Sequence, residues 1–575
     1  MRTRHKLLIP LLLLVVSWTA TSAPMRPTHA AHAMVTSIHE LASQAGVEVM
    51  KQGGNAIDAA VATGFALAVV HPAAGNIGGG GFMLVRMADG TLHFLDYREK
   101  APASATADMY LDKQGNVVPK MSLEGFKASG VPGSVAGMVY AQKKWGKLSL
   151  AAVMAPAITL ARDGYALAYE DARDLRDPLL AKFPESKRIF QRDGNYYQAS
   201  EVFKQPELAK TLERIAQNPD NFYKGEMARQ IAAFEAKHGG NITAKDMADY
   251  EVKERQPIHG AYRGLDIYSA PPPSSGGVAL VEALNILEGY DLAKLGNRSA
   301  DAMHLTIEAF RRAFYDRAEF MGDPDFARIP VAELIDKKYG VAWRESLNPD
   351  KASASSELKR PAAFKELDRY AATHPQPKNI REPEHTTHYS VVDTDGNAVA
   401  VTTTLNGGFG SGVTVEGLGF LLNNEMDDFS SKPGVPNMYG LIQGPANAIG
   451  PGKRPLSAMT PTIVTSNGKL LLVLGSPGGP TIITTVAHVL MGVVDYGMNI
   501  QEAVNAPRFH NQWLPDSTSI ERGFSPDTTR LLEQKGHKLA RKAYWGDAEC
   551  IMIDLKTGER LGAPDGRNNG KALGY

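Results

Sequence analysis

The stretch REPEHTTHYSVVDTDGNAVAVTTTLN, residues 381–406, joins a polar, proline-containing segment to a predicted β-hairpin. Two runs typical of strands, HYSVV and AVAVTTTL, are separated by DTDGN, whose residues favour turns. If Val392 pairs with Ala398 in an antiparallel register, Thr386 faces Thr404. Directly opposed residues project from the same face of a sheet, with Cβ atoms about 4.5–5.5 Å apart. The hairpin therefore predicts that these two threonine hydroxyls lie side by side.

The position of Thr386 at the end of a polar segment suggests a chemical role for it. We expect residues 351–384 to form a surface linker without regular structure. A threonine hydroxyl needs an adjoining base, and the α-amine of an N-terminal threonine, with a pKa of about 7.7–8.0, can supply one. Cleavage between His385 and Thr386 would create such a terminus at a flexible site. We interpret Thr386 as a latent nucleophile, and the alternative is a pair of ordinary strand threonines.

The rest of the chain alternates between helical and strand patterns. Residues 37–54 and 55–70 predict two helices, the second capped by Asn55. A glycine-rich loop then leads into two strands that meet at Asp89 and Gly90. Further strands are predicted at 417–424, 461–466 and 469–476, and a helix is predicted from Pro480. Strands between helices indicate a layered arrangement.

Composition excludes several classes of protein and indicates export. The 575 residues carry 62 basic and 62 acidic side chains, so no basic surface for nucleic acid is indicated. Residues 1–33 show the charged, apolar and small-residue order of a signal peptide, with cleavage expected after Ala23, Ala31 or Ala33. An uncleaved membrane anchor is the alternative. The apolar run is too short to span a bilayer, so we expect a periplasmic or secreted protein with no stable membrane span after signal removal. The single cysteine, Cys550, excludes an intramolecular disulfide.

Several segments resemble the γ-glutamyltransferases, which are self-processing N-terminal nucleophile hydrolases. The hairpin resembles the start of that family's small subunit, and further resemblances follow in family order from about residue 35 to the C-terminus. They are HPAAGNIGGGGFM (71–83), LDYREKAP (95–102), LLNNEMDDFS (421–430), KRPLSAMTPTIV (453–464), LGSPGGPTIITT (474–485) and NAPRFHNQWLPD (505–516).

The resemblance implies a fold and a division of the chain. It implies the α+β, four-layer αββα sandwich of the N-terminal nucleophile class. It also implies one precursor that is cut between His385 and Thr386. The large part would be 34–385 and the small part 386–575, held together as a heterodimer.

The resemblance also implies an activity, the cleavage of γ-glutamyl amides such as glutathione through a γ-glutamyl ester on Thr386. Water, an amino acid or a peptide would then accept the acyl group. Thr404 would support the nucleophile, and the guanidinium fork of Arg98 suits the donor's α-carboxylate.

The remaining roles implied by the resemblance concern the donor's head group and its carbonyl. The set that would bind the α-ammonium is Asn406, Glu425 and Asp428, and Ser457 would add a hydrogen bond to the α-carboxylate. Gly478 and Gly479, before the predicted helix at Pro480, would let backbone N–H groups reach the developing oxyanion. Tyr439 would gate the site as part of a lid. Without the resemblance, each motif also fits an ordinary loop or turn.

One residue departs from the family pattern. Ala458 follows Ser457 where the family usually has a second serine, which predicts weaker carboxylate binding or a changed donor preference. We expect no cofactor and no metal, because His385 and His388 form only H-x-x-H and no zinc pattern occurs. Two alternatives stay open: an acylase of the same fold acting on glutaryl-type amides, and an exported binding protein without turnover.

Overall fold

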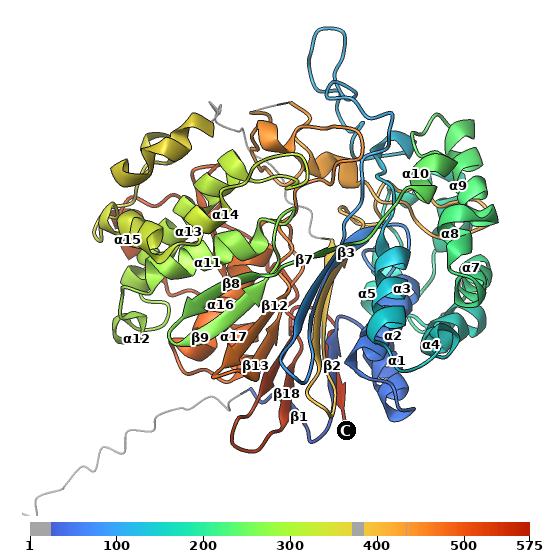
Figure 1. The fold of residues 1–575 in the computed structure, drawn as a ribbon, viewed down its shortest axis with the longest axis horizontal. Helices are drawn as coiled ribbons and strands as arrows, with labels where there is room; N and C mark the ends of the chain where they lie inside the picture. The colour runs from blue at the N-terminus through green and yellow to red at the C-terminus, as the bar shows by residue number, and fades with distance from the viewer. Residues whose placement is uncertain (1–24, 371–384, 433) are drawn as a thin grey trace, which may run out of the picture.

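Two seven-stranded antiparallel sheets form the centre of the molecule, as the computed structural model of residues 25–370, 385–432 and 434–575 shows (Figure 1). Most of the predicted signal peptide lies outside these described residues. In order across it, the first sheet consists of β1 (Thr28–Ala30), β18 (Arg560–Ala563), β17 (Cys550–Ile553), β13 (Lys469–Leu474), β12 (Thr462–Ser466), β9 (Leu265–Ser269) and β8 (Ile258–Tyr262). The second consists of β19 (Lys571–Gly574), β2 (Met34–Ser37), β10 (Thr386–Val392), β11 (Ala398–Thr404), β3 (Gly80–Arg86), β4 (Leu92–Tyr97) and β7 (Lys253–Arg255).

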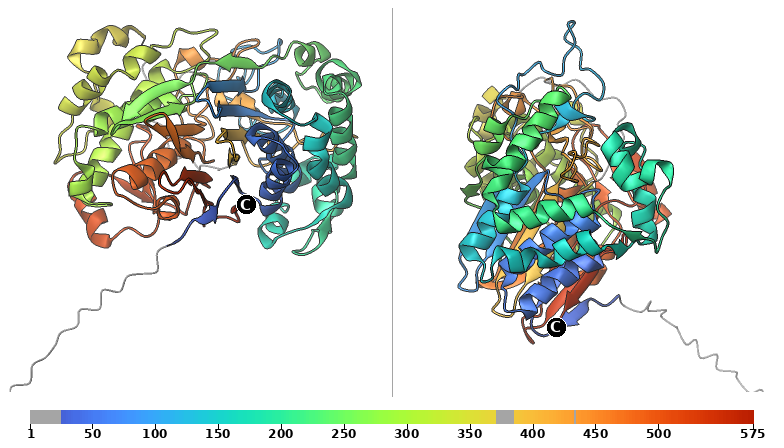
Figure 2. Two further views of the ribbon diagram at one scale, coloured as in Figure 1. Left: turned by 60° about the horizontal axis from the view of Figure 1, so that its bottom comes forward. Right: turned by 90° about the vertical axis from the view of Figure 1, so that its right-hand side faces the viewer.

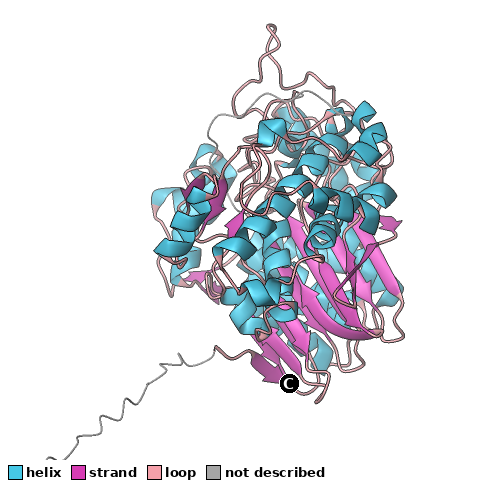
Figure 3. Ribbon diagram, turned by 90° about the vertical axis from the view of Figure 1, so that its left-hand side faces the viewer, coloured by secondary structure: helices cyan, strands magenta, loops and turns pink. Residues whose placement is uncertain are grey.

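Helices cover the outer face of each sheet, so the four-layer αββα prediction is confirmed (Figures 2 and 3). The second sheet packs against α1 (Glu40–Lys51), α2 (Ala56–Val70), α3 (Ser134–Trp145) and α4 (Leu150–Asp163). The first packs against α11 (Gly276–Leu287), α13 (Ala300–Phe320), α16 (Thr481–Val494) and α17 (Ile500–Asn505). Within the described residues, no helix combines the length and the apolar character needed to cross a membrane.

Smaller elements surround this sandwich. The further helices are α5 (Tyr169–Asp174), α6 (Pro184–Gln191), α7 (Pro206–Gln217), α8 (Asp220–Lys224), α9 (Glu226–Lys237), α10 (Ala244–Ala248), α12 (Leu292–Leu295), α14 (Val331–Leu334), α15 (Lys337–Glu345) and α18 (Pro526–Gln534). The further strands are β5 (Tyr165–Ala166), β6 (Val202–Phe203), β14 (Phe509–His510), β15 (Thr518–Ile520) and β16 (Leu539–Arg541).

Strand β10 lies inside its sheet, paired with β2 on one side and β11 on the other. The predicted hairpin register is confirmed, with Val392 opposite Ala398 and Thr386 opposite Thr404. Because successive side chains alternate between faces, Tyr389 and Val391 pack in the core shared with α2, whereas Thr386 projects between the two sheets. The strand is buried on both faces, which fits its high content of β-branched residues.

The two predicted N-terminal helices are also confirmed. Asn55 caps α2 through a reciprocal capping box with Asp58, and every residue of α2 is buried. The strand predicted over 417–424 is wrong, since the segment is a loop with one isolated bridge at Leu421. Gly417 and Gly419 have φ values of 72° and 70°, which breaks the extended backbone that a strand requires.

The first half of the predicted surface linker is docked to the core, which corrects that prediction. Arg360 is buried, and its Nη2 lies 2.5 Å from Oδ1 of Asp316 on α13. Ser355 is also buried and donates to the carbonyl of Trp513 at 2.7 Å. A buried arginine with a carboxylate partner overrides the disorder suggested by the polar composition of the segment. Residues 371–384 lie outside the described part of the chain.

We expect Arg360→Met to weaken the docking of residues 355–367 by about 3–5 kcal/mol, because Asp316 would keep a buried charge without its partner. Amide hydrogen exchange measured by mass spectrometry should then rise across 355–367. The matched control is Lys359→Met, because Lys359 is exposed and next in the chain. Equal exchange in both variants would show that other contacts hold the segment.

Candidate active site

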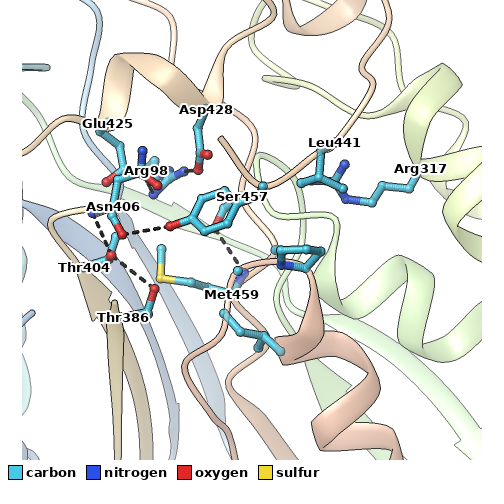
Figure 4. Close-up of a pocket in the computed structure, with 15 residues that line it drawn as sticks. Arg98, Arg317, Thr386, Thr404, Asn406, Glu425, Asp428, Leu441, Ser457 and Met459 are labelled. Atoms are coloured by element: carbon cyan, nitrogen blue, oxygen red, sulfur yellow. Dashed lines mark hydrogen bonds and ion pairs between the residues drawn. The ribbon is translucent and has the colours of Figure 1, made fainter. Parts of the chain in front are cut away.

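One pocket gathers most of the predicted site residues at the end of β10 and β11 (Figure 4). Its lining residues come from loops and helix ends far apart in the sequence. They are Arg98, Arg317, Thr386, Thr404, Asn406, Glu425, Asp428, Tyr439, Leu441, Ser457, Ala458, Met459, Gly479, Pro480 and Ile482. Gly478 directly precedes Gly479, and His385 directly precedes Thr386. The fold therefore brings the predicted groups together in one place.

Thr404 links the predicted nucleophile to the predicted cleavage site. Its Oγ1 lies 3.2 Å from Oγ1 of Thr386 and donates to the carbonyl oxygen of His385 at 3.2 Å. The N–H of Asn406 donates to the same Thr404 oxygen at 2.8 Å, aimed there by the left-handed backbone of Asn406 at φ 74°. Since Thr404 has one hydroxyl hydrogen and gives it to the carbonyl, Thr386 is the donor between the two hydroxyls.

Arg98 is buried and forms ion pairs with acidic side chains. Its Nη1 lies 2.5 Å from Oε1 of Glu425, and its Nη2 lies 2.5 Å from Oδ2 of Asp428. These two acids stand three residues apart on the short 3-10 helix η6 (Glu425–Asp428), so one turn presents both to the guanidinium. Arg98 thereby fixes the position of both carboxylates.

The carboxylates keep capacity for a further cation. Among the described residues, neither carboxylate oxygen of Glu425 accepts a hydrogen bond of good geometry. Its contact with Arg98 is therefore an ion pair in which the N–H bond does not point at the oxygen. Burial raises the pKa of Glu425 well above its usual range, and burial also raises the pKa of neighbouring Glu99 to about 7. An ammonium group placed beside Glu425 and Asp428 would favour their charged forms.

The Gly478–Gly479 turn has the geometry of an anion-binding loop. Their φ values are 129° and 54°, and a Cβ on Gly479 would lie 2.8 Å from the ring of Tyr439. The turn precedes α16, whose N-terminus carries a partial positive charge. Neither glycine N–H donates a hydrogen bond within the described parts of the chain. Both are therefore free to meet a developing oxyanion.

Tyr439 lines the pocket. Its side chain is buried, and its hydroxyl donates to the carbonyl of Asn406 at 2.8 Å. Gln512 donates to the backbone carbonyl of Tyr439 at 3.2 Å and holds the loop from the other side. Ser457 lines the same pocket, where its hydroxyl oxygen accepts from the N–H of Met459 at 3.1 Å and its own hydrogen stays available.

Sequence analysis missed Arg317, a buried arginine that lines the pocket from α13. No motif contains it, but the helical pattern held a signal. The residues three and four positions away on either side are Ala313, Phe314, Phe320 and Met321, all apolar. An arginine in the apolar stripe of a helix is unusual and indicates a specific task.

The family model described as gamma-glutamyltranspeptidase matches residues 42–575. This chain belongs to that family. It is 51% identical to the glutathione hydrolase proenzyme of Escherichia coli (strain K12), over 96% of this chain and 93% of the relative. It is 48% identical to the glutathione hydrolase proenzyme of Pseudomonas sp. (strain A14), over the full length of both. Among solved structures, cephalosporin acylase from Bacillus halodurans superimposes with a TM-score of 0.83 at 29% identity, covering 98% of this chain and 99% of that chain.

We expect Thr404→Val to slow the appearance of two chains from the precursor by about 10²–10³-fold, because the His385 carbonyl loses its hydroxyl donor. The rate is measured on denaturing gels during incubation of the purified precursor. Thr404→Ser is the control, since it keeps the hydroxyl and should retain most of the rate. Equal slowing in both variants would assign the effect to lost packing of the methyl group.

Proposed function

We propose that this chain is a glutathione hydrolase proenzyme that cuts itself between His385 and Thr386 and then cleaves γ-glutamyl amides. The observation that carries the proposal is the position of the Thr404 hydroxyl, which contacts both the Thr386 hydroxyl and the carbonyl oxygen of His385. Family membership and 51% identity to a glutathione hydrolase proenzyme support the same activity.

In self-cleavage, the Thr386 oxygen attacks the His385 carbonyl carbon, and the Thr404 hydroxyl stabilises the negative charge on the carbonyl oxygen. The peptide C–N bond then breaks, the nitrogen takes up the proton that the Thr386 hydroxyl gave up and becomes the Thr386 amine, and His385 becomes an ester on the Thr386 oxygen. Water hydrolyses this ester and releases the carboxylate of His385. The products are a free N-terminal threonine and a separate large chain.

In turnover, the freed amine of Thr386 removes the proton from its own hydroxyl, which attacks the γ-carbonyl of the donor. The N–H groups of Gly478 and Gly479 receive the oxyanion, and the leaving amine takes the proton. Water or an amino acid or peptide then accepts the γ-glutamyl group. At the other end of the donor, Glu425 and Asp428 face the α-ammonium, assisted by Asn406.

In the same turnover, Arg98 and Ser457 hold the donor's α-carboxylate, and Tyr439 acts as the lid. The large part, up to residue 385, and the small part, 386–575, stay associated as a heterodimer. The reason is that β10 and β11 of the small part are flanked by β2 and β3 of the large part. Separating the parts would expose strands that are buried on both faces, at a high cost in free energy.

We place the protein in the periplasm or outside the cell, on the strength of the signal-like residues 1–33. Strand β1 pairs with β18 from Thr28 onward. Cleavage after Ala23 preserves this strand, whereas cleavage after Ala31 or Ala33 removes it. Among the three sites, the pairing favours Ala23.

The main alternative function is that of an acylase for glutaryl-type amides. The similarity to a cephalosporin acylase supports this alternative. A glutaryl donor lacks the α-ammonium. It would therefore leave the buried carboxylate of Glu425 and the partly buried carboxylate of Asp428 without a cationic ligand beyond Arg98. This arrangement favours the γ-glutamyl donor.

We expect Thr386→Ala to remain a single full-length chain and Thr387→Ala to mature, because only Thr386 projects toward Thr404 and the pocket. Intact mass measurement after incubation distinguishes the two forms. Thr387→Ala is a close control, because Thr387 is also buried and its replacement by alanine removes the same side-chain atoms. A Thr386→Ala chain that still splits at this bond would overturn the proposed nucleophile. A wild-type chain that never matures would favour the binding protein without turnover.

We expect release of p-nitroaniline from the L-γ-glutamyl anilide to exceed release from the glutaryl anilide on the order of 10⁴-fold in kcat/KM, because the site is built around an ammonium group. Asp428→Asn removes one of the facing charges and should narrow this preference. Equal or faster cleavage of the glutaryl anilide by the mature wild-type enzyme would establish the acylase instead.

A further inference from the structure

Arg317 is a second buried guanidinium in the pocket, and none of the proposed roles uses it. Its side chain leaves α13 and reaches the pocket from the side opposite Arg98 (Figure 4). Only 2% of the residue is exposed. Its Nε donates to the hydroxyl oxygen of Ser275 at 2.9 Å. Its Nη1 is buried and has no hydrogen-bond partner among the residues that the structure describes.

The two arginines of the pocket differ in charge compensation. Arg98 has an ion pair at 2.5 Å to each of two acids. Within the described residues, Arg317 has no carboxylate oxygen at ion-pair distance. Burial lowers the pKa of Arg317 to about 10, opposed by the charge of Asp428, so the group stays positive at neutral pH. A buried, uncompensated cation is costly to the folded state, which indicates that an anionic ligand completes it.

Ser275 holds Arg317 against the segment that carries Ser457. The hydroxyl of Ser275 donates to the Ser457 carbonyl at 2.7 Å, so its oxygen is free to accept from Arg317. The N–H of Ser275 donates to the same carbonyl at 2.9 Å. The next residue, Ala458, lines the pocket with a methyl group and offers no side-chain donor. The guanidinium of Arg317 thus brings a charged hydrogen-bond donor to the pocket near Ala458, whose side chain cannot donate.

We propose that Arg317 is a second anchor for the α-carboxylate of the donor, acting through its guanidinium in the pocket that Ser457 also lines. This inference rests on the proposed γ-glutamyl specificity and adds a residue to it. A carboxylate accepts several hydrogen bonds through its two oxygens, so one can face Arg98 and the other Arg317. With Arg317, the pocket holds two cations and the two carboxylates of Glu425 and Asp428. Such a balanced set suits a zwitterionic head group, one ammonium and one carboxylate.

The test compares two donors in wild type and in Arg317→Met. One donor is the L-γ-glutamyl p-nitroanilide, and the other is the same molecule with its α-carboxylate converted to the neutral carboxamide. We expect Arg317→Met to lower kcat/KM for the carboxylate donor by about 10–100-fold, the usual effect of a lost charged hydrogen bond. With the carboxamide donor, the variant should stay within about 3-fold of wild type, because the interaction is already absent.

A merely structural role for Arg317 would lower the cleavage of both donors by the same factor, and that result would overturn the inference. Arg317→Lys keeps a positive charge and should recover part of the loss with the carboxylate donor alone. If Arg317→Met does not fold, Arg317→Lys replaces it in the test, and the ratio of kcat/KM for the carboxylate donor to kcat/KM for the carboxamide donor is measured on Arg317→Lys. An unchanged ratio in Arg317→Lys, with equal loss on both donors, would likewise overturn the inference.

The control variant is Arg344→Met on α15, a partly buried arginine whose Nη2 donates to the carbonyl of Asn285 away from the pocket. It should leave the ratio of the two donors at the wild-type value. Completeness of self-cleavage on a denaturing gel reports folding in every variant. If wild type matures and cleaves neither donor, the proposed substrate class fails, and that outcome is distinct from a failure of Arg317 alone.

Discussion

The pairing of β10 with β11 fixes which atoms can react, and the rest of the site is arranged around that pairing. A slip of one residue would turn Thr386 toward α2 and bring Thr387 to the pocket, because side chains alternate along a strand. Such a slip is resisted on both sides, since β10 is also paired with β2 and β11 with β3. Strands β2 and β3, which belong to the proposed large part, thus hold Thr386, the proposed nucleophile, in register.

Charge burial is the second constraint on the pocket. A charged group that is buried away from water needs a group of opposite charge or a hydrogen-bond partner, and only some of the charged groups in the pocket have one. Arg98 is held by two acids, while Glu425 has unused acceptor capacity and Arg317 has an unused donor. The unmet groups of opposite charge lie in one cavity, so a ligand with an ammonium and a carboxylate can satisfy both. The same groups whose burial costs stability would thereby provide selectivity for such a ligand.

Local patterns predicted the sheets better than they predicted the loops. The register of the hairpin, the Asn55 cap and the two N-terminal helices follow from periodicity and turn residues, which act over a few positions. Residues 417–424 form a loop because two glycines adopt positive φ. The pattern of apolar residues in this segment does not predict those backbone angles. The site residues of the loops were found through resemblance to a family. Arg317 was missed because its neighbours in space come from distant segments, although its place in an apolar stripe was visible.

Helix α13 connects the docked segment 355–367 to the pocket. Asp316 pairs with Arg360 of the former linker, and the next residue, Arg317, faces the pocket. Successive residues of a helix point about 100° apart, so one turn of α13 can contact the docked segment through Asp316 and the pocket through Arg317. Contacts of residues 355–367 with the core, such as the pair of Arg360 and Asp316, therefore brace α13. Because Arg360 precedes the proposed cleavage site at His385 and Thr386, the proposed cut leaves its pair with Asp316 intact, and the helix that carries Arg317 keeps this support.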